Sequence, residues 1–396
     1  MDTKQIEIKL KLVPKLRFKG FDTDWEEKKL GDIVQISSSA RVHKEEWAEN
    51  GVPFFRSSDV VSAFIGKQNM KAYISYELYN SLSKKIGKVK IDDLLITGGG
   101  SIGIPFLIRD NNPLYFKDAD LLWIKNNENI NGYFLYSYFL TPLFKNHLKN
   151  VSHIGTIAHY TVIQAKNTPF KLPSLPEQQK ISSFLSSVDE KIQQLSRKKE
   201  LLEQYKKGVM QQLFSGKLRF KDENGEDYAD WEKKKLGEVS TKKSSNISAN
   251  KIEDNIGEFI IYGASGILKK VDFYKEENDY ISIVKDGAGV GRLFYCKGKS
   301  SVLGTMEIIS PKQNIDTYFL YCLLSNIDFV KYVTGSTIPH IYFKDYSNEF
   351  CGIPSLQEQQ KIANFLSSID VKIESINQQM NQTQSFKKGL LQQLFV

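Results

Sequence analysis

Two glycine-rich stretches are the parts of this sequence whose spacing comes nearest to a phosphate-binding site. Residues 98–103 read GGGSIG, but Ile and Pro stand at 104–105, where a phosphate-binding loop carries Lys and Ser or Thr. Residues 286–292 read DGAGVGR and lack the spacing of a dinucleotide-binding loop. Neither stretch predicts a nucleotide site, so we interpret both as tight turns close to the backbone of a ligand. Their candidate contacts to phosphates or bases are Ser101, Lys285 and Arg292.

Other patterns that could support catalysis or metal binding are weak. The tetrapeptide NPLY at 112–115 departs at Leu114 from the Asn-Pro-Pro-Tyr with which amino-methyltransferases hold a flipped base, and we interpret it as a β-turn. The five histidines are scattered and the three cysteines form no CxxC pair. No Ser/His/Asp or paired-carboxylate pattern stands out either. We therefore expect no catalytic residue, no metal ligand and no cofactor on this chain.

The charge of the chain suggests a polyanionic partner. The formal net charge is +8 and the isoelectric point is about 9.0. Basic and polar residues in turn-like segments are of the types that reach base edges and phosphates. The alternative to a DNA contact is that each residue lies in a solvated loop or, for a histidine, that the side chain packs in the core. Further DNA-binding candidates are Arg41, His43, Lys44, Arg56, Ser57, His159, Tyr160, Lys242, Tyr262 and His340.

These candidates are carried on a duplicated unit. DWEEKKLGDI at Asp24 returns as DWEKKKLGEV at Asp230, and TIAH at Thr156 returns as TIPH at Thr337. The offset between the copies falls from 206 to 181 residues while the order of the landmarks is unchanged, as expected for deletions in loops. We expect target domains at 1–172 and 217–353, each followed by a helical region, at 173–216 and 354–396.

The globular parts have the pattern of a mixed α+β fold. Short β-branched and aromatic runs at 92–97, 280–285 and 292–296 predict strands. The runs at 131–149 and 316–333 each predict one helix. We expect two related α+β domains.

Each unit ends in a long helix. Ser-x-x-Glu at 174–177 and 355–358 predicts a capping box at each start. A heptad stripe follows and predicts either a partner helix or packing on the adjoining domain. Short connections favour an antiparallel pair, which would act as a coiled-coil spacer with pseudo-two-fold symmetry between the two domains. The expected spacer residues are Glu177, Ile181, Leu185, Val188, Ile192, Glu358, Ile362, Leu366, Ile369 and Ile373.

Three repeated features carry a resemblance to a known family: EQQKI with KKG…QQLF, the WExKKLG segments and the TIAH/TIPH segments. In these features the chain resembles the specificity subunit of type I restriction–modification enzymes. The resemblance implies that each domain reads one half of a bipartite double-stranded DNA site. It also implies that the helices set the spacer and dock two methyltransferase subunits, with restriction (translocase) subunits completing the complex. S-adenosylmethionine, ATP and magnesium would then act on those partners.

Two other functions remain open. The chain could be the specificity subunit of a type IIB-like methyltransferase–nuclease, or a coiled-coil scaffold that does not bind DNA. No stretch is long and apolar enough to predict a membrane span, and the cysteine pattern fits a cytoplasmic protein.

Overall fold

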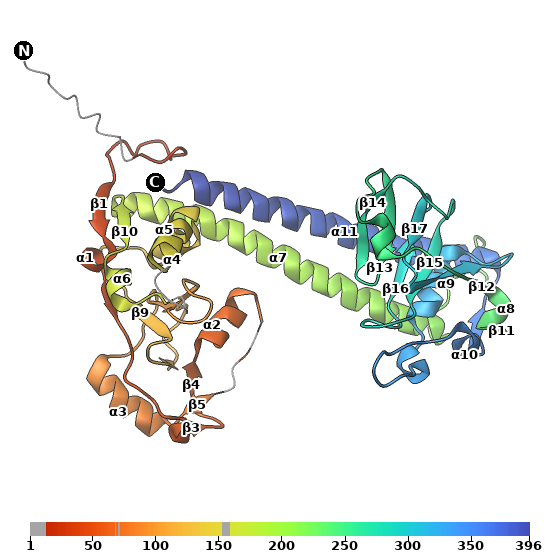
Figure 1. Ribbon diagram of the computed structural model, residues 1–396, viewed down its shortest axis with the longest axis horizontal. Coiled ribbons are helices and arrows are strands. Elements are labelled where there is room, and N and C mark those ends of the chain that lie inside the picture. Colours follow the sequence, from red (N-terminus) through yellow and green to blue (C-terminus); the bar gives the residue numbers. More distant parts are fainter. Residues whose placement is uncertain (1–12, 68, 70–71, 153–158) are drawn as a thin grey trace, which may run out of the picture. The chain divides into compact units, whose positions relative to one another are not determined.

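The chain folds into two compact units, as Figure 1 shows in a computed structural model that describes residues 13–67, 69, 72–152 and 159–396. The first unit comprises residues 1–195 and 379–396, and the second comprises residues 196–378. Each unit therefore contains one globular part and a share of both long helices. In the described ranges, no helix is long and apolar enough to cross a lipid bilayer.

The globular part of the first unit is built on two four-stranded sheets. The antiparallel sheet has the order β2 (Gln35–Ser37), β9 (Leu121–Lys125), β6 (Leu94–Thr97), β7 (Pro105–Leu107). The other has the order β3 (Trp47–Ala48), β5 (Tyr73–Ile74), β4 (Val52–Phe55), β8 (Tyr115–Phe116). A ribbon pairs β1 (Glu26–Lys29) with β10 (Pro169–Leu172). The helices are α1 (Leu30–Ile33), α2 (Ser57–Phe64), α3 (Tyr76–Ile86), α4 (Gly132–Leu140), α5 (Pro142–Ser152) and α6 (Val162–Lys166).

The globular part of the second unit repeats this plan with a three-stranded second sheet. Its antiparallel sheet has the order β12 (Ser240–Ser244), β18 (Met306–Pro311), β15 (Tyr280–Val284), β16 (Leu293–Cys296). The second sheet has the order β14 (Gly266–Val271), β13 (Phe259–Gly263), β17 (Ser300–Val302). A ribbon again pairs β11 (Glu232–Lys235) with β19 (Phe350–Ile353). The helices are α8 (Leu236–Val239), α9 (Thr317–Ser325) and α10 (Phe343–Tyr346).

The predicted strands are confirmed as β6, β15 and β16. In the two equivalent antiparallel sheets β6 and β15 are central strands, and β16 is an edge strand. The mixed α+β class with two related domains is likewise confirmed. The prediction of one helix at 131–149 is wrong, because α4 ends at Leu140 with Thr141 as its C-cap, and α5 begins at Pro142, which lacks the N–H that a continuing helix needs. The prediction at 316–333 is wrong in the same way, since α9 ends at Ser325 and only a 3₁₀ turn, η3 (Phe329–Tyr332), follows.

The long helices are α7 (Leu175–Phe214) and α11 (Leu356–Gln393), and they pair antiparallel. In the first unit Lys387 lies 2.6 Å from Asp189, and in the second unit Lys206 lies 2.5 Å from Asp370. From the first contact to the second, the contacting residue lies 17 positions later in α7 (189 to 206) and 17 positions earlier in α11 (387 to 370). This confirms the antiparallel pairing predicted from the short connections.

The sequence left open whether each heptad stripe packs on a partner helix or on the adjoining domain, and the structure shows both kinds of packing. In the first unit Ile181, Leu185 and Val188 belong to one buried cluster with Phe134 of the globular part and Leu394 of the opposing helix. In the second unit Ile362, Leu366 and Ile369 pack with Phe319 and with Leu213 of α7. Each stripe therefore packs on its own domain and on the partner helix at once.

Candidate nucleic-acid interface

The glycine-rich loop of the first unit is a tight turn between β6 and β7. The Thr97 N–H donates to the Ile104 carbonyl (3.1 Å) and the Gly103 N–H donates to the Thr97 carbonyl (2.7 Å). Gly103 has φ +78°, and a Cβ there would lie 2.3 Å from Leu148 Cδ2, so glycine is required. Ser101 is exposed on this turn. The predicted tight turn is confirmed.

Three other segments of the first unit converge on this loop. The Tyr160 N–H donates to the Gly98 carbonyl (2.9 Å), and the Gly98 N–H donates to the Asp120 carbonyl (2.8 Å). The Ser57 hydroxyl, at the start of α2, donates to the same Asp120 carbonyl (2.9 Å). His159 is exposed beside the loop. We call this surface, made of residues 57, 98–104, 118–120 and 159, the first glycine-loop face.

The second unit builds an equivalent face from different residues. The Val284 N–H donates to the Arg292 carbonyl (2.9 Å) and the Gly291 N–H donates to the Val284 carbonyl (2.8 Å), as in the first loop. The Ile341 N–H donates to the Lys285 carbonyl (3.0 Å), so the segment that leads towards α11 is again fastened to the loop. The Lys285 N–H also donates to the Thr305 carbonyl (3.1 Å). We call residues 285–292, 305 and 336–340 the second glycine-loop face.

The second glycine-loop face brings together three of the predicted DNA contacts. Arg292 is exposed, and its guanidinium donates to the Ala264 carbonyl (2.9 Å), which orients the group without neutralising it. Among the described residues Arg292 forms no ion pair. Lys285 lies 4.0 Å from Asp286, and His340 Nδ1 lies 3.1 Å from the Ile338 carbonyl. The Arg292 guanidinium and the Lys285 ammonium lie at fixed positions on a shared surface, which suits them to contacts with phosphates.

Other predicted contacts lie elsewhere or are engaged within the fold. Arg41, His43 and Lys44 are exposed on and before the 3₁₀ turn η1 (Lys44–Glu46) and stay candidates. The Arg56 guanidinium lies 2.9 Å from the buried Asp59 carboxylate and covers the Trp47 ring, so it fastens the start of α2. Lys242 lies 3.2 Å from the buried Glu307 and is half exposed.

The two predicted tyrosine contacts are corrected by their burial. Tyr160 is 1% exposed and its hydroxyl shares a hydrogen bond with Thr168 (2.6 Å), so it packs in the core. Tyr262 is 7% exposed within β13. Burial raises the pKa of both phenols. Neither side chain can reach a duplex in this conformation.

The glutamates at the starts of the long helices also have a role other than the predicted one. Ser355 does accept a hydrogen bond from the Glu358 N–H (3.3 Å), as a capping box requires. The Glu358 carboxylate, however, is fully buried and accepts hydrogen bonds from Arg219 (2.8 and 3.2 Å) and Trp231 (3.1 Å). Glu177 is bound by Arg17 through two contacts of 2.8 Å. A buried, fully paired carboxylate fixes the helix start and cannot dock another subunit.

A signal for these arginines was present in the sequence. KLRFK occurs at 15–19 and again at 217–221, and its third residue is the arginine that binds the glutamate. The repeat therefore begins before the DWE segment that marks it most clearly. Hydrogen bonding to the glutamates raises the pKa of Arg17 and Arg219, so both guanidinium groups stay charged.

A second duplicated contact joins each globular part to both long helices. In the first unit the Tyr133 hydroxyl of α4 donates to Asp189 of α7, which also binds Lys387 of α11. In the second unit Tyr318 of α9 donates to Asp370 of α11, which also binds Lys206 of α7. Burial, together with the adjacent carboxylate, raises the pKa of both tyrosines, so both stay hydrogen-bond donors. Each Tyr–Asp–Lys triad thus fixes the helix register against a domain.

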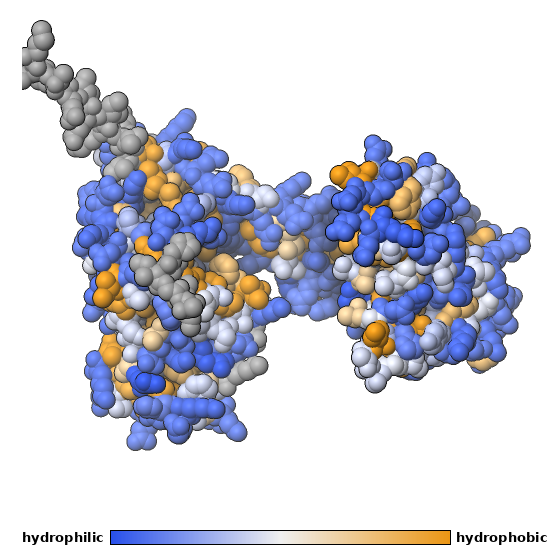
Figure 2. All heavy atoms as spheres, viewed as in Figure 1, coloured by the Kyte–Doolittle hydropathy of each residue, from blue (hydrophilic) through white to orange (hydrophobic). Residues whose placement is uncertain are grey.

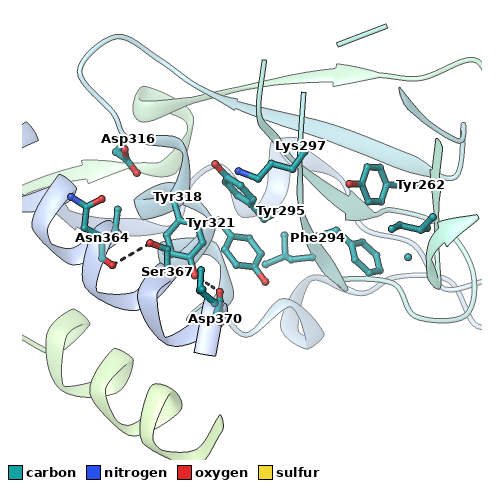
Figure 3. Close-up of a pocket in the computed structure, with 15 residues that line it drawn as sticks. Tyr262, Phe294, Tyr295, Lys297, Asp316, Tyr318, Tyr321, Asn364, Ser367 and Asp370 are labelled. Atoms are coloured by element: carbon teal, nitrogen blue, oxygen red, sulfur yellow. Dashed lines mark hydrogen bonds between the residues drawn. The ribbon is translucent and has the colours of Figure 1, made fainter. Parts of the chain in front are cut away.

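A hollow of about 650 Å³ opens beside the triad of the second unit, and Figure 3 shows the tyrosines that line it. Several of its polar groups are engaged within the fold. Tyr295 donates to Asp279 (2.8 Å), Asp316 caps α9, and Tyr318 donates to Asp370. The hollow therefore presents aromatic surface and no arrangement of free acid, base and nucleophile.

Comparison with known proteins decides the family. The family model described as the type I restriction modification DNA specificity domain matches residues 22–204 and 228–384, one match for each copy of the repeat. The chain belongs to the type I restriction–modification DNA specificity family. Each match begins two residues before the DWE segment of its copy of the repeat.

Relatives along the whole chain agree with this assignment. The type I restriction enzyme MjaIX specificity subunit of Methanocaldococcus jannaschii is 25% identical over 410 residues, covering 94% of this chain and 92% of the relative. The crystal structure of a type I restriction-modification system S subunit from M. genitalium superposes with a TM-score of 0.63 at 18% identity, covering 97% of this chain and 99% of the other. A structure from a study of complex assembly and conformational transition in a type I system gives 0.54 at 16% identity, covering 95% and 98%. These two structures share the fold.

Proposed function

We propose that this chain reads a bipartite double-stranded DNA sequence for a type I restriction–modification complex and catalyses no reaction itself. Each glycine-loop face would contact one half of the site. The single observation that carries the proposal is that the same hydrogen-bonded face is built twice, once in each unit, from residues that differ outside the repeated TIAH/TIPH segment. Equivalent scaffolds with different surface residues are what two different half-sites require.

We propose that the long helices carry two docking sites for one kind of partner, a methyltransferase subunit. The ten positions 196–205 share no residue with their counterparts 377–386, so the two copies have diverged freely in mid-helix. Towards the helix ends, exposed residues are nevertheless identical in the two copies. They include Leu175, Gln179, Lys191, Lys207 and Gln211, matched by Leu356, Gln360, Lys372, Lys388 and Gln392.

Packing does not account for these identities, because exposed substitutions change stability by less than about 0.5 kcal/mol. A partner that binds each copy would account for them. The first unit holds Leu175, Gln179 and Lys191 with Lys388 and Gln392, and the second unit holds the five counterparts. Partner subunits would then supply the S-adenosylmethionine, ATP and magnesium chemistry, with restriction subunits joining the complex.

The docking proposal is tested by counting methyltransferase subunits per chain by mass measurement of the purified complex. Lys191→Glu with Lys388→Glu should remove one copy, and Lys372→Glu with Lys207→Glu should remove the other. Lys198→Glu, at an exposed position that differs between the copies, is the matched control and should leave both. Full occupancy in both double variants would reject these sites.

The DNA-reading proposal is tested by methylation-sensitive genome sequencing of a host with and without this gene. A split motif should be methylated only when the gene is present. Replacing residues 25–172 by the corresponding segment of another family member should change one half-site and leave the other. Failure to co-purify with a methyltransferase, together with no salt-dependent binding of duplex DNA, would instead favour a scaffold.

A further inference from the structure

The second glycine-loop face carries an isoleucine that folding does not require. Ile338 is 63% exposed at the tip of the turn 334–340. The Thr334 N–H donates to the His340 carbonyl (2.9 Å), and the His340 N–H donates back to the Thr334 carbonyl (2.8 Å), which closes the turn. Gly335 has φ +88°, and a Cβ there would lie 2.4 Å from the Ile338 carbonyl. The turn is therefore braced on both sides of an exposed apolar side chain.

The turn is also fastened to the glycine-rich loop at 285–292. The Gly287 N–H donates to the Pro339 carbonyl (2.8 Å), which joins the two segments directly. Arg292, Lys285 and His340 belong to the same face. Figure 2 shows that hydrophilic residues cover most of the visible face of each unit and that apolar residues form scattered patches. An apolar tip on the same face as the Arg292 guanidinium suits a ligand with anionic edges and an apolar interior, which describes a DNA duplex.

Comparison of the two copies of the repeat shows which residues the two faces share and which residues differ. Thr337, Ile338 and His340 correspond to Thr156, Ile157 and His159, whereas the four residues before each segment differ at every position. Residues 156–158 lie outside the described residues, but His159 lies beside the first glycine loop, as His340 lies beside the second. If the two domains read different half-sites, a shared element has a task that does not depend on base sequence.

We propose that Ile338 is a sequence-independent wedge that enters the minor groove and partly unstacks one base step, while Arg292 holds a flanking phosphate. This rests on the proposed DNA-reading function. Apolar side chains inserted between base steps kink duplexes in this way, and the cost of unstacking is recovered through added backbone contacts. The competing role for an exposed aliphatic residue is contact with a thymine methyl group in the major groove, which would be specific for sequence.

The test compares Ile338→Ala and Ile338→Leu in the complete complex with its methyltransferase partner. Ile256→Ala is the matched control, because Ile256 is also exposed (86%) in the second unit. Two duplexes serve as probes: one carries the motif mapped by methylation sequencing and the other a scrambled motif. Both carry 2-aminopurine for unstacking and a terminal dye pair for bending. Thermal unfolding confirms that each variant folds.

Ile338→Ala should weaken binding of both duplexes by about tenfold, leave their affinity ratio unchanged, and abolish the fluorescence rise and the bend. Ile338→Leu should retain both signals, and Ile256→Ala should match the parent. The wedge is overturned if the parent complex binds DNA without either signal, or if Ile338→Ala binds normally. It is also overturned if the loss is confined to the motif and is reproduced by replacing thymine with uracil. Absence of any DNA binding by the parent complex would instead reject the proposed function.

Discussion

Arg219→Ala should be among the most damaging single substitutions in the second unit. The change leaves the Glu358 carboxylate, which has no exposed surface, with only the Trp231 N–H as a side-chain hydrogen-bond donor. Removing one partner of a buried ion pair costs about 3–5 kcal/mol. For a unit of this size that corresponds to a fall of about 6–20 °C in Tm, with the remaining Trp231 bond favouring the lower part of the range.

Two further variants isolate the cause. Arg219→Ala with Glu358→Gln should recover much of the loss, because a neutral amide needs no counter-charge and can still accept from Trp231. Arg17→Ala is the matched change in the first unit and should cost more, because the Trp25 N–H lies buried with no hydrogen-bond partner and so does not support Glu177. Differential scanning calorimetry of the full chain measures all three. A Tm within 2 °C of the parent for Arg219→Ala, or a double variant no better than the single one, would refute the reasoning.

Three more predictions concern titration, reactivity and spacing. Burial lowers the pKa of His147, so the folded state binds its proton less readily than the unfolded state. The contribution of this residue to the free energy of unfolding should be complete above about pH 6.5 and should fall at lower pH. His147→Gln should therefore make the urea midpoint of unfolding less dependent on pH between about pH 7.5 and 5.5. A parallel decline in the variant would contradict this. Burial raises the pKa of Cys296 and Cys351 to about 11 and of Cys322 to about 12, so a disulfide reagent at neutral pH should label these thiols only after denaturation. Labelling of the folded chain at the rate of a free peptide thiol would show otherwise. Matched insertion of one heptad in both long helices adds about 10 Å, or about three base pairs, and should lengthen the DNA spacer by that amount without altering either half-site. Changed half-sites would reject this prediction.

Much of the architecture follows from local pattern. The strands at β6, β15 and β16 are short apolar runs bounded by turn residues, and the long helices follow a heptad stripe. The antiparallel pairing follows from short connections. These features depend on neighbouring residues and on repetition, both of which can be read along the chain. The break at Pro142 was also visible, because proline removes the N–H of a continuing helix, but the apolar run around it outweighed that signal.

The candidate site was less predictable, because burial is a property of distant partners. By itself the sequence determined a duplicated α+β unit, paired helices, two tight glycine turns and a basic surface. The tertiary structure decided that Tyr160 lies in the core, that Arg56 is held by Asp59, and that Glu177 is bound by Arg17, which is 160 residues away. It also left the Ile338 side chain exposed on the same face as Arg292. Residue type and local spacing predict an element, whereas the solvent exposure of a polar or apolar side chain depends on which remote segments pack over it.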